Sequence, residues 1–387
     1  MLSIKSWFSN KTTITWIDMK IVYIASIRLP TEKAHGVQIM KTCEAFSENG
    51  IKIKLFVPNF IFDKKRQDAF EYYGVKKAFE IKKFFSVRLI RLGPIGFFLE
   101  TFIFFLSVIF SSDFWLADYV FSRDEMLVVF SGILGKKTIW ETHTGSYNFF
   151  ARVSLKTSTF VVSISKGLKD FYISKDVNPS KIIVAHDGVD LDDFQVSLSK
   201  EEARKSLGLP LDKKIVLYAG RLDGWKGSET FFEASKSFDD STVAVVVGGE
   251  KNQIEMFNKK YPKIIFIGYR PYKELPLFQK TADVLVVPNT GKDNVSRLYT
   301  SPLKVFSAMA SGVPIVASDL PSIREVLADG GNSVLVLPDS PEALFEGIMG
   351  ILGDETKAGI IAKQALSDVS GYSWKERVRV VISYISK

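Results

Sequence analysis

The stretch "SPLKVFSAMASGVPIVASDLPSIREVL", residues 301–327, reads as a helix, a glycine stop, a short buried strand and a turn into another helix. Ser301 is expected to cap the first helix, with Pro302 in its first turn. Gly312 is expected to end that helix, and Val313–Ala317 is an apolar run typical of a strand. Because a capped helix N-terminus attracts anions, the stretch also predicts a place for a phosphate group.

The same alternation of short apolar runs and helical patterns extends along most of the chain. In the first half an amphipathic helix is expected at 36–50, and strands are expected at 20–26, 52–58, 118–123, 136–143, 159–165 and 181–189. A second series follows a polar segment, with strands expected at 214–220, 242–249, 263–269, 282–289 and 313–319. This rhythm predicts α/β architecture, with two Rossmann-like, doubly wound parallel-sheet domains facing a cleft.

The change of pattern around 190–212 sets the expected domain boundaries. We expect an N-terminal extension at 1–19, an N-terminal domain at 20–195, a linker at 196–212, a C-terminal domain at 213–370, and a C-terminal helix at 371–387 that packs back toward the N-terminal domain. In open α/β sheets, ligands bind outside the carboxyl ends of the strands. Both domains are expected to present those ends to the cleft.

The composition is that of an ordinary globular protein. Of 387 residues, 46% are hydrophobic and 24% are charged, which is enough apolar material for two cores. The single cysteine, Cys43, excludes an internal disulfide and favours a reducing compartment, so a cytoplasmic location is expected. Three histidines without ligand spacing give no indication of a metal site, and none is predicted.

The excess positive charge lies in the first quarter of the chain. Residues 1–91 hold 17 Lys and Arg against 8 Asp and Glu, whereas the rest holds 34 against 35. Such a segment attracts membranes, nucleic acids or anionic substrates, although a solvated lysine-rich face is the plainer alternative. The apolar run 95–110 is shorter than the ~20 residues that span a bilayer, so it predicts either a half-buried core helix or a peripheral membrane contact at the inner face of the cell membrane. No nucleic-acid motif accompanies the charge, and no nucleic-acid partner is predicted.

The first strand of the second series ends in "AGRLDGWKG", residues 219–227. Gly220 allows a sharp turn, and Arg221 and Lys226 then leave the same strand end, a pair of cations that suits a diphosphate. Thr300, Ser301 and Leu303 can add hydroxyl and backbone N–H groups at the start of the helix in the 301–327 stretch. The chain has no G-x-G-x-x-G after the first strand and no phosphate-loop motif, so it lacks the usual marks of hydride transfer and of phosphate-loop hydrolysis.

Several of these motifs together resemble a known family. "YAGRLDGWKG", "ADVLVVP", the 301–327 stretch and "VAHDGVDLDDF" are similar to the retaining GT-B glycosyltransferases of family four, the glycosyltransferase group 1 type. "RLPTEKAHGVQIM", "YVFSRD", "WETHTG" and "VVSISKGL" resemble a branch that builds polysaccharides and lipopolysaccharides. The resemblance covers nearly the whole chain from about Lys20.

The resemblance implies an enzyme of the hexosyltransferase type, without metal or cofactor. A nucleotide-diphospho-sugar is the expected co-substrate in the C-terminal domain, and a glycan or lipid-linked acceptor is expected in the N-terminal domain. The implied catalytic residues are Arg221, Lys226 and His143. The implied donor-binding residues are Gly36, Gly220, Tyr269, Arg270, Tyr299, Thr300, Ser301, Leu303 and Ser307. The implied acceptor-binding residues are Arg28, His35 and Glu141.

The chain departs from the family at two positions, and the departure leaves two functions open. The family carries two glutamates eight residues apart, where this chain has Tyr299 and Ser307, and the second glutamate normally accepts a hydrogen bond from the ribose. One hypothesis is an active, retaining, metal-independent glycosyltransferase in cell-surface polysaccharide biosynthesis. The other is a catalytically weak or silent partner subunit that still binds nucleotide sugars. Few histidines and no clustered acids at 299–307 argue against an epimerase of the same fold.

Overall fold

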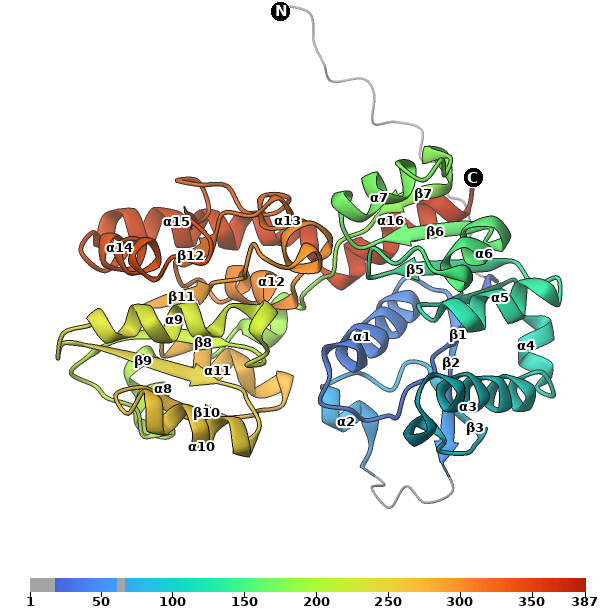
Figure 1. The fold of residues 1–387 in the computed structure, drawn as a ribbon, viewed down its shortest axis with the longest axis horizontal. Coiled ribbons are helices and arrows are strands. Elements are labelled where there is room, and N and C mark those ends of the chain that lie inside the picture. The colour runs from blue at the N-terminus through green and yellow to red at the C-terminus, as the bar shows by residue number, and fades with distance from the viewer. Residues whose placement is uncertain (1–17, 61–66) are drawn as a thin grey trace, which may run out of the picture.

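The computed structural model describes residues 18–60 and 67–387 as two α/β lobes that lie side by side (Figure 1). Each lobe is built on one parallel sheet, which confirms the predicted fold class. Most of the N-terminal extension expected at 1–19 lies outside the described residues.

The N-terminal lobe contains a seven-stranded sheet of order β3-β2-β1-β4-β5-β6-β7 within the described residues. Its strands are β1 Lys20–Ile24, β2 Lys52–Phe60, β3 Glu80–Ser86, β4 Tyr119–Ser122, β5 Thr138–Thr142, β6 Phe160–Ser163 and β7 Ile182–Val184. Its helices are α1 Ala34–Glu48, α2 Ala69–Tyr73, α3 Gly93–Val108, α4 Ser112–Leu116, α5 Glu125–Ile133, α6 Phe149–Thr157 and α7 Lys166–Ile173. The sequence did not predict β3, an edge strand whose residues are exposed or half-buried except for Ser86.

The C-terminal lobe contains a six-stranded sheet of order β10-β9-β8-β11-β12-β13 in the described part of the chain. Its strands are β8 Lys214–Ala219, β9 Thr242–Val247, β10 Ile265–Gly268, β11 Val284–Val287, β12 Ile315–Ser318 and β13 Val334–Val336. Its helices are α8 Lys200–Leu207, α9 Ser228–Ala234, α10 Lys251–Lys260, α11 Leu275–Lys280, α12 Leu303–Ala310, α13 Pro321–Arg324, α14 Pro341–Leu352 and α15 Glu355–Asp368. β9 is buried along its whole length, as a central parallel strand with helices on both faces should be.

Helix α8 lies in the segment expected to be a linker. Ser199 and Glu202 form a reciprocal capping box at its start, and Gly208 ends it in the left-handed conformation. Arg204 ties the helix to the C-terminal lobe, since its guanidinium bonds Asp283 at 2.6 Å and the carbonyl of Thr281 at 2.9 Å.

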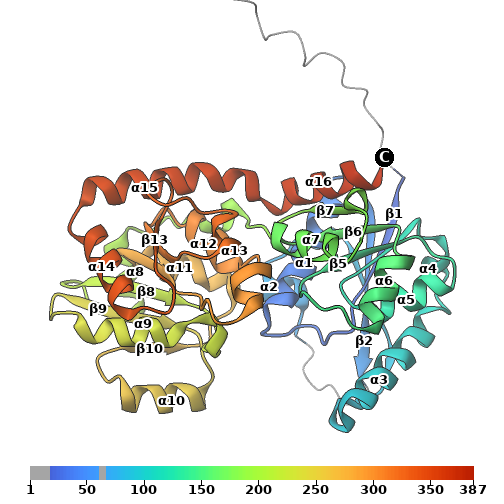
Figure 2. The ribbon, with the colours of Figure 1, turned by 45° about the horizontal axis from the view of Figure 1, so that its top comes forward.

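The C-terminal helix α16, Trp374–Ile385, packs on the N-terminal lobe. Figure 2 shows α15 and α16 following one another along one side of both lobes. Trp374, Val378, Val381 and Ile382 join the buried cluster that contains Met40 of α1. The chain therefore crosses between the lobes twice, once before α8 and once before α16.

The start of α12 differs from the sequence prediction. The helix begins at Leu303 with Pro302 in the capping position, and no side chain caps it, so the expectation that Ser301 caps this helix is wrong. The Ser301 hydroxyl instead accepts a hydrogen bond from the backbone N–H of Asp187, at 2.9 Å, in the other lobe. Gly312 follows the helix with a φ of 68°, as predicted.

The apolar run 95–110 forms most of α3, on the outer edge of the N-terminal lobe (Figure 2). Phe104, Phe105 and Val108 are buried against the sheet. On the opposite face Ile95 is 72% exposed, and Phe110 beyond the helix is 87% exposed. By length and composition, Ile90–Val108 could cross a membrane, although part of this segment is buried in the protein.

Candidate active site

A cleft of about 460 Å³ lies between the two lobes, at the carboxyl ends of strands from both sheets. The predicted site residues that line it are His35, His143, Gly220, Arg221, Lys226, Tyr269, Arg270, Thr300, Ser301, Leu303 and Ser307. The structure thus brings together residues of α1 and α12 and residues that directly follow β5, β8 and β10. Two of them, His35 and Ser307, lie 272 positions apart in the chain.

Four predicted residues do not line the cleft. Arg28 is exposed, and Gly36 lies in α1, where an added Cβ would stand 2.1 Å from the hydroxyl of Tyr73. Glu141 is buried behind His143, and Tyr299 packs against the other lobe, 5.4 Å from the ring of Phe171. Gly36 therefore serves the packing of α1 against Tyr73, and Glu141 has no surface left for an acceptor.

The loop that follows β8 carries two cations, Arg221 and Lys226, and it passes close to the end of β11. Arg221 is exposed, and its Nε lies 3.0 Å from the carboxylate of Asp223. The Nζ atom of Lys226 lies 3.5 Å from the centre of the Trp225 ring. Burial lowers the pKa of Lys226 to about 8. The loop depends on Gly227, which has a φ of 70° and passes so close to Pro288 that a Cβ would meet its carbonyl oxygen.

The start of α12 faces these cations across the floor of the cleft. Thr300 and Ser301 are buried, and Lys304 projects from the first turn of the helix. The hydroxyl of Ser307 donates to the carbonyl of Lys304 at 3.1 Å and accepts from Nε2 of Gln279 at 3.2 Å. A serine–glutamine contact therefore occupies the place where the family resemblance implies a glutamate.

The wall from the N-terminal lobe is built on a buried chain of charged groups. Nε2 of His143 lies 2.6 Å from Oε1 of Glu141, and Nη2 of Arg377 in α16 lies 2.5 Å from Oε2 of the same carboxylate. Arg377 and the nearby His143 hold the pKa of Glu141 well below its usual value, although burial acts in the opposite direction. Burial and then the Arg123 guanidinium lower the pKa of His143 to about 4, so the imidazole is neutral at neutral pH. A neutral ring that donates from Nε2 keeps Nδ1 as an acceptor.

A second series of polar contacts lies in the same wall of the cleft. Nη1 of Arg123 donates to Oε1 of Gln38 at 2.7 Å, and the Gln38 amide donates to Asp187. Burial raises the pKa of Asp187 to about 7, and its Oδ1 has no hydrogen-bond partner in the described part of the protein. Burial also lowers the pKa of His35, to about 4.

The two lobes touch at both sides of the cleft. The hydroxyls of Tyr72 and Tyr269 lie 2.6 Å apart. On the other side, Glu325 of the C-terminal lobe accepts hydrogen bonds from the backbone N–H groups of Lys166 and Gly167, at 2.7 and 2.9 Å. This carboxylate caps α7 from the opposite lobe.

The sequence reasoning missed several residues of the cleft, namely Gln38, Tyr72, Arg123, Asp187, Trp225 and Lys304. Only Lys304 carried a signal, because a lysine in the first turn of a helix lies at the wrong end of the helix dipole. The others are brought in by tertiary contacts between distant segments. Among residues 18–60 and 67–387, no group of three or more His, Cys, Asp and Glu side chains is placed to hold a metal ion.

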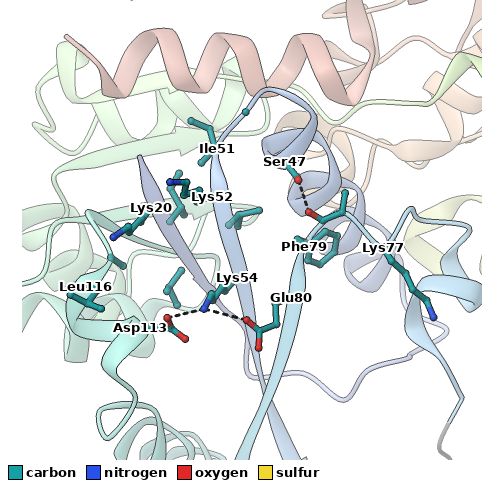
Figure 3. Close-up of a pocket in the computed structure, with 16 residues that line it drawn as sticks. Lys20, Ser47, Ile51, Lys52, Lys54, Lys77, Phe79, Glu80, Asp113 and Leu116 are labelled. Carbon is teal, nitrogen blue, oxygen red and sulfur yellow. Dashed lines mark hydrogen bonds and ion pairs between the residues drawn. The ribbon is translucent and has the colours of Figure 1, made fainter. Parts of the chain in front are cut away.

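A second hollow, of about 830 Å³, lies at the opposite end of the N-terminal sheet (Figure 3). Lys20, Lys52, Lys54 and Lys77 surround it. Lys54 bonds Asp113 at 2.8 Å and lies 3.2 Å from Glu80. Lys54 in this hollow is therefore already paired with carboxylates, unlike Lys226 in the cleft.

Residues 199–367 match the family described as glycosyl transferases group 1. The C-terminal lobe is a glycosyltransferase group 1 domain. The whole chain is similar in structure to HepE of Anabaena in its complex with UDP-glucose, with a TM-score of 0.75 and 16% sequence identity over 95% of this chain and 100% of that one. At this identity the likeness shows the fold, which is GT-B.

Curated glycosyltransferases are 25–29% identical to this chain over about half of its length. A D-inositol 3-phosphate glycosyltransferase of Corynebacterium aurimucosum is 25% identical over 55% of this chain and 53% of its own length. A putative teichuronic acid biosynthesis glycosyltransferase of Bacillus subtilis, TuaC, is 29% identical over 53% of this chain and 49% of its own length. The chain thus spans about half the length of these two curated relatives.

Proposed function

We propose that the protein is a retaining, metal-independent glycosyltransferase that moves a sugar from a nucleotide-diphospho-sugar to a glycan or lipid-linked acceptor in cell-surface polysaccharide biosynthesis. The observation that carries this proposal is the cleft itself. Arg221, Lys226 and the start of α12 meet there beneath the carboxyl ends of the C-terminal strands, opposite His143 of the other lobe.

The chemistry follows from these charges. Transfer breaks the bond between the anomeric carbon of the sugar and the diphosphate, and negative charge develops on the departing oxygen. Arg221 and Lys226 would stabilise that charge, the effect that is usually the largest contribution to catalysis. The hydroxyl of Ser301 would donate to the same phosphates, since it accepts from Asp187 and keeps its own proton free.

His143 would act as a neutral hydrogen-bond acceptor. Its Nε2 is taken by Glu141, so Nδ1 remains for a hydroxyl of the donor sugar or of the acceptor. Arg377 and Glu141 hold the ring without touching substrate. Glu141 is thus a positioning residue in this proposal.

The acceptor class is supported by the resemblance of the N-terminal lobe and by TuaC, whose name refers to teichuronic acid biosynthesis. The name of another relative, a D-inositol 3-phosphate glycosyltransferase, refers instead to a small phosphorylated molecule. The test is incubation with UDP-, GDP- and ADP-sugars and a panel of lipid-linked and soluble acceptors. Product with the donor's anomeric configuration supports the proposal, and absence of transfer and hydrolysis by folded protein contradicts it.

A peripheral contact with the inner face of the cell membrane is part of the proposal. The exposed apolar side of α3 lies beside the exposed basic residues Lys83, Arg88 and Arg91. Apolar groups next to basic ones favour binding to an anionic lipid surface. Sedimentation with vesicles that contain anionic phospholipid should pull down the protein. The double variant Ile95→Ser/Phe110→Ser should stay in solution, and equal sedimentation of both would contradict a contact at this face.

The second candidate function is a silent partner subunit, and Tyr299 and Ser307 are the observations that favour it. Tyr299 lies outside the cleft, and Ser307 is held by Gln279 and by the carbonyl of Lys304. A folded protein that binds a nucleoside diphosphate but neither transfers nor hydrolyses any sugar would support this candidate over the active enzyme.

A further inference from the structure

Lys304 is a cation of the cleft that has no anionic partner. It is the second residue of α12, and its Nζ lies 3.4 Å from the carbonyl oxygen of Lys226 and 5.1 Å from the centre of the Tyr218 ring. In the described part of the chain no carboxylate oxygen lies within 4.0 Å of the ammonium of Lys304 or of Lys226. Asp223, the acid of this loop, pairs with Arg221.

Three physical effects act against a positive charge at this position. The side chain is partly buried, and loss of water disfavours the ammonium. The neighbouring Lys226 repels it, and these two effects lower the pKa of Lys304 well below its usual value. The first turn of a helix is also its positive end, which disfavours a cation. An anion bound between the two lysines would offset all three effects by its attraction for the ammonium groups.

Ser307 explains why Lys304 remains unpaired. The two residues are three positions apart on α12, the spacing at which side chains on one helix face meet. A carboxylate at 307 would lie within reach of the Lys304 ammonium. The serine is too short for this, and its hydroxyl contacts Gln279 and the backbone of Lys304 instead.

We propose that Lys304 is a third cation of the donor-phosphate site, beside Arg221 and Lys226, and that the serine at 307 keeps it free to bind a nucleoside diphosphate. This inference rests on the proposed function, because it assumes that the cleft holds a nucleotide donor. It gives the departure from the family pattern a physical role: the position that lacks a carboxylate leaves an additional positive charge at the phosphates.

The first experiment measures binding of UDP, GDP and ADP, and of the corresponding nucleosides, by isothermal titration calorimetry. Lys304→Met keeps the length of the side chain and removes its charge. It should weaken binding of the nucleoside diphosphate about 10- to 100-fold, the loss of one charge-assisted contact, and leave nucleoside binding unchanged. Lys292→Met, which removes an exposed lysine outside the cleft lining, is the control for net charge and should bind as the wild type does.

A second variant tests the role of position 307. Ser307→Glu should also weaken diphosphate binding, because the new carboxylate pairs with Lys304 and repels phosphate. In the Lys304→Met background, Ser307→Glu should weaken diphosphate binding only by repelling the phosphates. Its effect there should be smaller than the effect of Ser307→Glu in the wild-type protein. Melting temperatures without ligand show that each variant is folded, and Lys304→Arg, which keeps the charge, should retain part of the affinity.

Proton uptake separates a phosphate contact from a purely structural role. Binding of the diphosphate raises the pKa of the lysines, so at pH 8 the wild type should take up protons, seen as a binding heat that depends on the buffer. Lys304→Met should take up fewer. Equal diphosphate affinity and proton uptake in Lys304→Met and wild type, or tighter binding by Ser307→Glu, would overturn the inference while leaving the proposed function intact. Failure of every nucleotide to bind the wild type would overturn both.

Discussion

The two walls of the cleft use charge in opposite ways. On the N-terminal wall Glu141 is 2% exposed, and both of its carboxylate oxygens are bonded, one to His143 and one to Arg377. On the C-terminal wall Lys226 and Lys304 face the cleft with no carboxylate partner among the described residues. The paired charges of Glu141 and Arg377 hold the neutral imidazole of His143 in place. The ammonium groups of Lys226 and Lys304, in contrast, would gain an anionic partner only when a ligand binds.

This difference separates residues that stabilise the site from residues that bind a ligand in it. Removing one member of a buried pair leaves an uncompensated charge and should lower stability. Removing an unpaired cation should leave stability unchanged or raise it, and should lower ligand binding and turnover instead.

The largest effect is expected on the N-terminal wall. Glu141→Gln removes the carboxylate that is hydrogen-bonded to the buried Arg377, and should lower the free energy of unfolding by about 3–5 kcal/mol. Urea unfolding followed by circular dichroism measures it. The double variant Glu141→Gln/Arg377→Met removes both charges and should recover part of the loss. A single variant as stable as the wild type would mean that the ion pair does not hold this wall.

The next effect is catalytic. Lys226→Met should lower kcat about 100- to 1,000-fold, because the departing diphosphate loses a preorganised cation. Its melting temperature should equal or exceed that of the wild type, since no ion pair is broken. Steady-state transfer assays with the donor found in the panel give kcat. A variant that is less stable but fully active when folded would show that Lys226 stabilises the fold and does not contribute to catalysis.

The third prediction concerns pH. The pKa of Lys226 is lowered to about 8 in the free protein, and a bound diphosphate raises it again. The affinity for nucleoside diphosphate should therefore be fully present below pH 8 and fall as the pH rises above 8, because the deprotonated amine no longer attracts the phosphate. Calorimetric titrations between pH 7 and 9.5 measure this. In Lys226→Met the dependence should become shallower, and an identical profile would contradict the assignment.

The smallest effect is expected at the contact between the lobes. Tyr72→Phe removes the hydroxyl that lies 2.6 Å from that of Tyr269. A neutral hydrogen bond contributes about 0.5–1.5 kcal/mol, so donor affinity should fall by no more than about tenfold with kcat little changed. A large fall in kcat would instead give Tyr72 a place in the chemistry.

Much of this fold could be predicted from the sequence, because most of its strands and helices are determined by local sequence patterns. The strands at 20–26 and 214–220 and the glycine after α12 are each fixed by a few neighbouring residues, and the structure confirms them. The edge strand β3 was missed because an edge strand needs no apolar run. The cap expected from Ser301 failed because a tertiary partner, the N–H of Asp187, lies 114 positions away.

The candidate site shows the same limit. The cations of the β8 loop were predicted from a strand end and its glycines, and the structure places them in the cleft. The role of Glu141 could not be predicted, because it depends on Arg377, which lies 236 positions away on a helix that returns from the other lobe. Lys304 lies within residues 301–327, but its role could not be predicted from that stretch. The role depends on the absence of a carboxylate near its ammonium, which only the structure reveals.

We infer that the cations of the C-terminal wall form a charge cluster that a nucleoside diphosphate neutralises. Calorimetric binding of UDP, GDP and ADP to the wild type and to the double variant Arg221→Met/Lys226→Met tests it most directly. We expect at least one of these nucleotides to bind the wild type, and the folded double variant to bind it more than 100-fold more weakly. Equal binding by both proteins, or no binding by the folded wild type, would contradict it.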